Sequence, residues 1–368
     1  MVWSRVDATS PAAKAAIEDL LDCAISSGIE VHKSLQVRER DGQISLHADA
    51  PRGDVLVRVP EDLLVPVAET GWGTSDDVLS IARHDPTASA PQRELIEAHL
   101  AVYNSTGKIR WARNTLPVMV LSRDAAVAST VRLLRPSFPQ ESPSTAEGFI
   151  NTRLYQQAVT CDGVLMPVID FLNHHRRGAK LLIDDGAMTV RVEHAAGDMQ
   201  CFASYGSRRD LLDLALGYGF VDPAVRFARS LAVSTDIPGF GNVEVLGRRR
   251  EAVSSLDPPQ ITMERKRLSL SHLSFHAEHP DRVVSVLQLA VGSYLAQHVD
   301  PPHEPLLTAR AVVAALASAN IDLLRRAESQ LADSTTEAAH VLSAAISGQR
   351  DIIEQVRRNA MQASLPLH

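Results

Sequence analysis

Two short polar pairs each close an apolar, strand-like run. The first pair is Asn173-His174, and the second is Tyr205-Gly206, which a Tyr-Gly-Phe at 218–220 follows. Amide, imidazole and phenol groups donate and accept hydrogen bonds, so such a set could hold a polar ligand and orient a reacting group. A metal site at His174-His175 is not indicated, because no other ligand has suitable spacing.

Taken one at a time, these side chains have plainer interpretations. Tyr205 or Tyr218 alone is more often a core tyrosine with a satisfied hydroxyl. Asn173 and His174 alone favour a hydrogen-bonded turn. Arg153 alone would usually form a surface ion pair. The ordered combination along the chain is what favours a functional site.

Apolar spacing predicts the elements that must position these residues. Residues 12–27 have helical spacing and end at Gly28. The runs 44–46 and 55–59 indicate two strands around a turn at 51–54. A hairpin is predicted from 180–183 and 188–192, joined by a loop at 184–187 that contains Asp-Gly. From about residue 283 onward the spacing is helical.

The element order predicts an α+β chain in four stretches. These are 1–74, an N-terminal helix and the first part of a β core; 75–150, a helical insert; 151–225, the second part of the core; and 226–368, a mainly helical C-terminal lobe. The insert splits the β core into two sequence segments.

Composition limits the classes of protein. Lys and Arg number 37 against 44 Asp and Glu, a formal charge of −7, which argues against nucleic-acid binding through a basic surface. The basic patches at 248–250 and 265–267 are interpreted as solvated surface. Apolar runs fall short of the roughly 20 residues that span a bilayer, and no signal-peptide core is present. The three cysteines, Cys23, Cys161 and Cys201, lie far apart, so no disulfide or zinc pattern appears and a cytoplasmic location is expected.

In combination, the motifs resemble those of SET-domain methyltransferases, in the branch with the Rubisco large-subunit lysine methyltransferases and the actin-histidine methyltransferases. The resemblance covers most of the chain in the expected order. It rests on the strand segment 41–60, Trp111 with Leu116-Pro117, Asn151-Thr152-Arg153, Asn173-His174, Tyr205-Gly206 and Tyr218-Gly219-Phe220. It implies an α+β fold: a β-rich SET core with a knot-like C-terminal crossing, a helical insertion and an all-helical C-terminal lobe.

The resemblance also implies S-adenosylmethionine (SAM) as cofactor and an N-methyltransferase acting on a protein side chain, with lysine as the first expectation and histidine as the alternative. The catalytic residues would be Tyr205, which orients the acceptor, and Tyr218, which binds its nitrogen. Residues expected to hold the cofactor are Arg153, Asn173, His174, Phe220, Ser45 and Leu46. Methyl transfer is an in-line displacement that needs positioning and no metal. A lysine acceptor must first lose its proton.

The chain departs from the family at the first strand. Members usually have Gly-x-Gly before Leu-x-Ala, where the backbone approaches the cofactor; here Gln43-Ile44-Ser45 precedes Leu46. Two added side chains would narrow the pocket, and Gly42 would compensate through a shifted turn. Two alternatives therefore remain: a SET-fold enzyme for a small-molecule biosynthetic substrate, and a non-catalytic peptide-binding module. The oligomeric state stays open.

Overall fold

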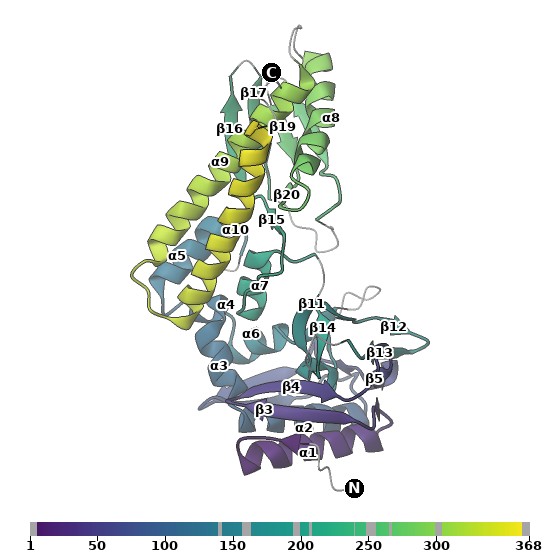
Figure 1. Ribbon diagram of the computed structural model, residues 1–368. Coiled ribbons are helices and arrows are strands. Elements are labelled where there is room, and N and C mark those ends of the chain that lie inside the picture. The colour runs from purple at the N-terminus through teal and green to yellow at the C-terminus, as the bar shows by residue number, and fades with distance from the viewer. Residues whose placement is uncertain are drawn as a thin grey trace. The chain divides into compact units, whose positions relative to one another are not determined.

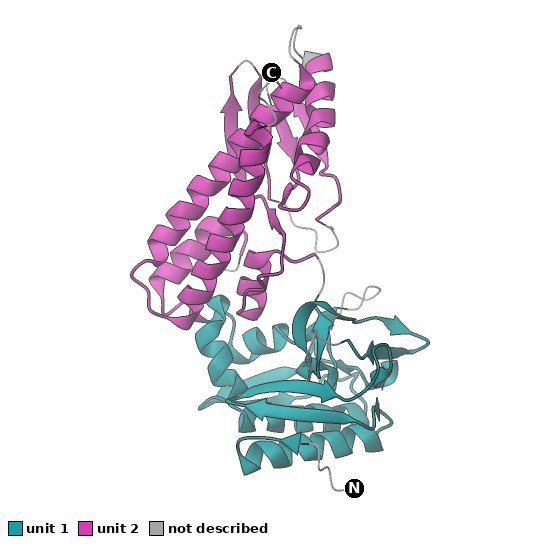
Figure 2. Cartoon of the chain, viewed as in Figure 1, with its two compact units in different colours: residues 1–119, 142–207 teal, residues 120–141, 208–368 magenta. Residues whose placement is uncertain are grey.

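The computed structural model divides the chain into two compact units. Unit 1 contains residues 1–119 and 142–207, and unit 2 contains residues 120–141 and 208–368 (Figure 2). The structure describes residues 6–138, 142–156, 163–193, 199–205, 208–238, 240–247, 255–264, 267–298 and 304–362. The predictions for Cys161, Gly206, the basic patch 248–250 and residues 265–266 lie outside these ranges. The 75–150 stretch contributes to both units.

Unit 1 is built mainly from short strands (Figure 1). Its strands are β1 Val6–Asp7, β2 Glu30–Val31, β3 Leu35–Arg40, β4 Gln43–Ala48, β5 Val55–Pro60, β6 Val65–Pro66, β7 Gly71–Ser75, β8 Val78–Arg83, β9 Leu154–Gln156, β10 Gly163–Leu165, β11 Asn173–Lys180, β12 Ile183–Asp184, β13 Ala187–Arg191 and β14 Gln200–Ser204. Its helices are α1 Pro11–Ser26, α2 Ala90–Ser105, α3 Lys108–Thr115 and α6 Thr145–Asn151, with short 3-10 turns η1 Glu61–Leu63 and η2 Ile169–Phe171. α4, Pro117–Val120, lies at the first boundary between the units.

Three sheets and two helices enclose the core of unit 1. The largest sheet has the order β1-β3-β4-β14-β11, and the others are β12-β13-β5-β2 and β6-β10-β9, besides the β7-β8 hairpin. α1 begins where the Ser10 hydroxyl accepts the N–H of Ala13 and buries Ile17, Leu20 and Leu21. α1 packs against α2 beneath the strands (Figure 1). The helix predicted at 12–27 is thus confirmed.

The hairpin predicted near residue 185 forms with a tighter loop than expected. β12 and β13 pair Ile183 with Met188 and Asp184 with Ala187, so that only Asp185 and Gly186 connect them. Both loop residues have positive φ, 48° and 68°, which a two-residue Asp-Gly turn requires. The two strands predicted at 44–46 and 55–59 also form, as β4 and β5, but they belong to different sheets: β4 pairs with β3 and β14, whereas β5 pairs with β2 and β13.

Unit 2 combines short strands with long helices. Its strands are β15 Phe227–Arg229, β16 Val233–Ile237, β17 Gly241–Val245, β18 Ile261–Glu264, β19 Arg267–Leu270 and β20 Ser274–His276. Its helices are α5 Ala125–Leu134, α7 Leu211–Tyr218, α8 Asp281–His298, α9 Pro305–Leu331 and α10 Glu337–Gln362. The strands form sheets β16-β17-β19-β18 and β15-β20. The expectation of an all-helical lobe is therefore corrected, while the long helices after residue 280 are confirmed.

Helix α9 is the central helix of unit 2. It packs against α5, α8 and α10 (Figure 1), and its buried positions include Ala309, Val313 and Leu316. Among the residues that the structure describes, α9 is also the one helix long and apolar enough to cross a membrane by length and composition. Its packing on three helices is that of a core helix.

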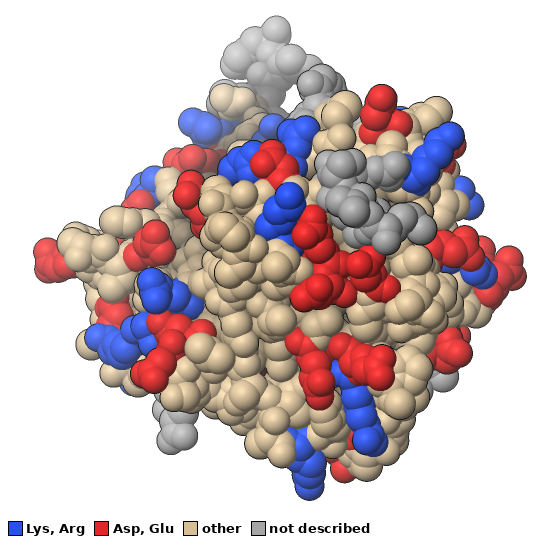
Figure 3. All heavy atoms as spheres, turned by 90° about the horizontal axis from the view of Figure 1, so that it is seen from below, with Lys and Arg blue, Asp and Glu red and all other residues tan. Residues whose placement is uncertain are grey.

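On the molecular face shown in Figure 3, acidic and basic side chains are interspersed.

Candidate active site

Neighbouring strands of the large sheet bring the first motif residues together. β14 lies between β4 and β11 in the sheet, and β11 begins at Asn173. The Asn173 side chain donates from Nδ2 to the carbonyl oxygen of Ile44 at 3.3 Å. This bond reaches over to β4, the strand that contains Gln43-Ile44-Ser45. The half-buried Asn173 side chain therefore links β11 to β4, and Asn173 is not simply a residue that forms a turn.

His174 and Tyr205 contact each other directly. The Tyr205 backbone N–H donates to Nδ1 of His174 at 3.1 Å, and the two rings lie 5.1 Å apart. Because Nδ1 accepts this bond, it carries no proton, and a neutral ring has its proton on Nε2. The Tyr205 hydroxyl donates to the carbonyl oxygen of Leu172 at 2.8 Å. The phenol is thus fixed beside the Asn173-His174 pair.

A glycine permits the close approach of β11 and β14 at this point. A Cβ on Gly178 would lie 2.6 Å from the Ala203 carbonyl carbon and 2.8 Å from its oxygen. The parallel ladder shifts register here, so that both His174 and Ala179 pair with Ala203. The chain between them bulges, and glycine is needed because backbone atoms leave no room for a side chain.

Arg153 forms a partly buried ion pair rather than a surface one. Its Nη1 lies 3.8 Å from Oδ1 of Asp170, and the two side chains are 14% and 5% exposed. Its guanidinium also lies 5.1 Å from the ring centre of Phe149. Asp170 sits in η2, just before Asn173, so this carboxylate links Arg153 to the motif segment.

A buried hydrogen-bonded chain, absent from the sequence predictions, holds that segment from below. The Tyr103 hydroxyl donates to Oδ2 of Asp170 at 2.5 Å, and it lies 3.1 Å from Nδ1 of His99. Nε2 of His99 accepts the backbone N–H of Val168 at 3.0 Å, so the proton of a neutral ring lies on Nδ1 and points to Tyr103. Burial lowers the pKa of His99 to about 4, against a smaller opposing effect of Asp170. Burial likewise raises the pKa of Tyr103.

Val168 shows why this support matters. It is a buried, β-branched residue with φ 64°, a conformation that L-residues rarely adopt. Such a backbone costs about 1–3 kcal/mol and persists only when its surroundings fix it. The His99 bond fixes it, and the turn at Val168 directs Asp170 and Asn173 to their places.

Lys108 is a second residue that the sequence predictions missed. It is 6% exposed, and its Nζ donates to Oε1 of Gln43 at 2.8 Å. Burial, and then the neighbouring Arg153 guanidinium, lower the pKa of Lys108 to about 7. The side-chain amide of Gln43 thus binds this amine. No local spacing marks Lys108 or His99 in the sequence, because each meets the site only through the fold.

The remaining residues of the first strand are placed within the sheet. Leu46 is fully buried and pairs with Val37 on β3 and Cys201 on β14. The Ser45 hydroxyl lies 3.0 Å from Nε2 of His47. The cofactor contacts expected for Ser45 and Leu46 stay predictions.

Tyr218 and Phe220 belong to unit 2. Tyr218 ends α7, Gly219 follows with φ 72°, and the rings of Tyr218 and Phe220 lie 6.2 Å apart. The Arg209 guanidinium lies 4.9 Å from the Tyr218 ring centre. The roles of Tyr218 and Phe220 beside Tyr205 stay predictions, as does the knot-like crossing.

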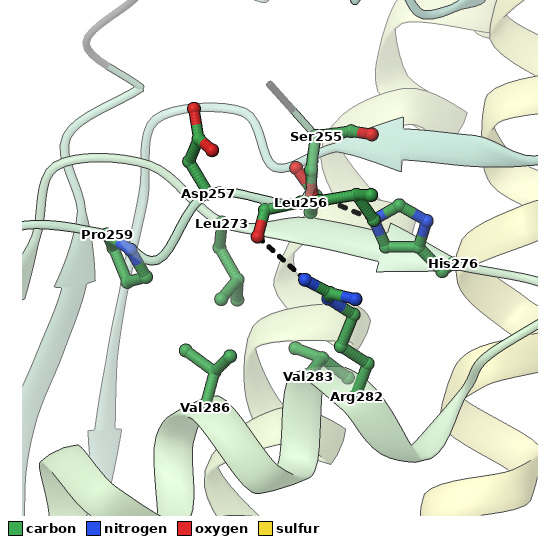
Figure 4. Close-up of a pocket in the computed structure, with 10 residues that line it drawn as sticks. Ser255, Leu256, Asp257, Pro259, Leu273, His276, Arg282, Val283 and Val286 are labelled. Atoms are coloured by element: carbon green, nitrogen blue, oxygen red, sulfur yellow. Dashed lines mark hydrogen bonds between the residues drawn. The ribbon is translucent and has the colours of Figure 1, made fainter. Parts of the chain in front are cut away.

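Unit 2 also contains a small surface pocket that no motif predicts (Figure 4). His276 and Arg282 lie on its wall, where Nε2 of His276 is 2.9 Å from the Ser255 carbonyl oxygen and Arg282 donates to the Leu256 carbonyl oxygen at 2.8 Å. Both polar groups thus serve to hold the loop around Leu256. Within the described ranges, no group of three His, Cys, Asp or Glu residues is placed to hold a metal ion.

Comparisons with known proteins give two similar solved structures. One is the SET domain of LSMT bound to lysine and AdoHcy, at 14% identity and TM-score 0.43. The other is Rubisco LSMT bound to sinefungin and monomethyllysine, at 13% identity and TM-score 0.45. Each alignment covers 96% of this chain and 92% of that chain. No protein-family model matches the chain, and no curated protein matches it.

Proposed function

We propose that this protein is a SET-type, SAM-dependent N-methyltransferase that modifies a protein side chain, with lysine as the acceptor. The observation that carries the proposal is the contact set around Tyr205. Its hydroxyl is fixed on the Leu172 carbonyl, its N–H on His174, and the adjacent Asn173 reaches β4. The start of β11 and the end of β14 therefore meet at Tyr205, and Asn173 links them to β4; methyl transfer requires such fixed positioning.

The described residues fit the groups that SAM presents. A carboxylate and an ammonium call for a cation and for acceptors, and the Arg153-Asp170 pair offers both signs of charge close to Asn173. Bound SAM would supply a methyl group on a positively charged sulfur. The protein's part is to hold the cofactor, exclude water and place the attacking nitrogen in line.

Tyr205 has a defined part in placing that nitrogen. Since its single hydroxyl proton is donated to Leu172, its oxygen acts toward an incoming amine as an acceptor. An amine N–H bound there would turn its lone pair away from the phenol. The amine must arrive neutral, because an ammonium has no lone pair, and a desolvated channel favours the neutral form.

Titration calorimetry with SAM tests the proposal. Wild type is expected to bind SAM with micromolar affinity, and Asn173→Ala is expected to lower that affinity at least tenfold. Tyr205→Phe is expected to keep an affinity within about threefold of wild type, since the phenol acts on the acceptor. In a labelled-methyl assay with protein and free-lysine acceptors, Tyr205→Phe is expected to lower transfer about 100-fold.

Other outcomes separate the alternatives. Label on histidine alone would make the acceptor assignment wrong, and label on a metabolite alone would make this a small-molecule enzyme. Correctly folded wild type that binds no SAM would contradict the proposal and favour a peptide-binding module. The Gln43 position would then be the first place to look.

A further inference from the structure

Lys108 is a buried amine at the edge of the candidate site. It is the first residue of α3, its ammonium carries three donors, and the Gln43 amide oxygen accepts one of them. Its Nζ also lies 5.5 Å from the ring centre of Trp111. Lysine is rarely buried to 6% exposure without a carboxylate partner, and the hydrogen-bonding partner here is a neutral amide. A buried amine in this setting has donor capacity for a further acceptor.

A tight backbone contact fixes where Lys108 stands. Gly42 has φ 79°, and a Cβ there would lie 2.5 Å from the Thr106 carbonyl oxygen. The turn between β3 and β4 therefore lies directly on the residues that precede Lys108. Because Asn173 reaches the Ile44 carbonyl in the same strand, Lys108 and Asn173 approach β4 at adjacent residues, 43 and 44.

The two carboxylates that act on Lys108 are held by other donors. The charged groups that act electrostatically on Lys108 are Arg153 from the segment after α6, Asp170 from η2 and Glu39 from β3. Glu39 is already bound by the backbone N–H of Gly42, at 2.6 Å, and by Thr9. Asp170 is shared between Arg153 and the Tyr103 hydroxyl. In this low-dielectric region, an additional anion bound at Lys108 would stabilise its protonated form.

We propose that Lys108 binds the carboxylate at the amino-acid end of the cofactor together with Arg153, an inference that rests on the proposed function. A bound carboxylate favours the protonated amine, so binding draws a proton onto Lys108. Because a group with a pKa of about 7 is half protonated at pH 7, binding takes up to about half a proton from solution. The substituted glycine strand then contributes a cofactor contact through Gln43, which orients the amine.

Calorimetry with two ligands tests the inference. S-adenosylhomocysteine has the amino-acid end, and 5′-methylthioadenosine is the same nucleoside without it. Lys108→Met is expected to lower the affinity for S-adenosylhomocysteine between about tenfold and a hundredfold, as for a lost charge-assisted hydrogen bond. It is expected to lower the affinity for 5′-methylthioadenosine less than twofold. The matched control is Lys14→Met, which removes an exposed lysine of α1 and is expected to change neither ligand.

Proton uptake gives a second readout. At pH 7, binding enthalpies of S-adenosylhomocysteine measured in phosphate and in Tris are expected to differ for wild type and for Lys14→Met, and to agree for Lys108→Met. If Lys108→Met bound S-adenosylhomocysteine with the same affinity and the same proton uptake as wild type, the inference would be overturned while the methyltransferase proposal stayed intact. If Lys108→Met lowered the affinity for S-adenosylhomocysteine and for 5′-methylthioadenosine by the same factor, the inference would also be overturned, because such a result indicates a structural role. Folded wild type that binds no S-adenosylhomocysteine contradicts the proposed function, and the inference falls with it.

Discussion

At the residue scale, the candidate site depends on buried side chains that support its backbone. His99 accepts the N–H of Val168 and, through Tyr103, supports Asp170. His99 is neutral in the folded protein. Protonation of its Nε2 would remove the lone pair that accepts the Val168 N–H, and so would break this chain. The backbone of the motif segment is therefore linked to the protonation state of one buried imidazole.

Stability is expected to fall between pH 6.5 and pH 4 because of His99. Its pKa is about 4 when folded and 6.5 ordinarily, so in this window the unfolded chain binds a proton that the folded chain does not. Linkage gives a loss of about 2 kcal/mol between pH 7 and pH 5. Urea unfolding of His99→Gln should lack this share of the loss, whereas the exposed His340→Gln should keep it. An unchanged pH dependence in His99→Gln would contradict the assignment.

The residues that could be predicted from sequence are those in short local motifs. Asn173 and His174 meet Tyr205 because they begin β11 and Tyr205 directly follows its partner β14, although the apolar run before Asn173 contains a 3-10 turn and is not the expected strand. His99 and Lys108 could not be predicted, since they come from helices α2 and α3 and join the site only through long-range packing.

At the element scale, the geometry of the site depends on how closely β11 lies against β14. Gly178→Ala would press a methyl group into the backbone of Ala203. We expect it to destabilise the protein by about 1–3 kcal/mol and to move His174 away from Tyr205, so that SAM binding weakens as well. Thermal unfolding and calorimetry check both effects. Gly217→Ala, in open space on α7, is the control and should be neutral or stabilising. A Gly178→Ala variant as stable as wild type would contradict the packing argument.

Elements were predictable where their pattern is local and long. The period of residues 12–27 and of the C-terminal helices specifies α1, α9 and α10, and Asp185-Gly186 specifies a hairpin. The partners of β4 and β5 could not be predicted, because strand pairing depends on contacts distant in sequence. The strands β15 to β20 were missed because they are too short for alternation to separate them from loops.

At the scale of the whole molecule, the chain crosses between its units instead of completing one before the other. The segment 120–141 leaves unit 1 and becomes part of unit 2. Asp124 anchors it there: its carboxylate caps α5 at Ala126 and Val127 and accepts the hydroxyls of Ser334 and Thr336 at 2.6 and 2.8 Å. The Pro-rich and Ser-rich stretch from Arg135 to Thr145 indicates a connection, but nothing in the sequence shows that α5 before it packs within unit 2.

This exchange determines how the molecule should unfold. When unit 2 unfolds, residues 120–141 become a loop within unit 1, and closing a loop costs only about 0.6 kcal/mol more for each doubling of its length. We therefore expect two calorimetric transitions. Asp124→Ala removes a helix cap and two hydrogen bonds of unit 2, so it should lower the free energy of unfolding of unit 2 by about 2 kcal/mol. The transition temperature of unit 2 should fall, and that of unit 1 should not change. Asp322→Ala, which removes an exposed carboxylate from α9, should shift neither by more than about 0.5 kcal/mol. A single transition that Asp124→Ala moves as a whole would show that the two units unfold together.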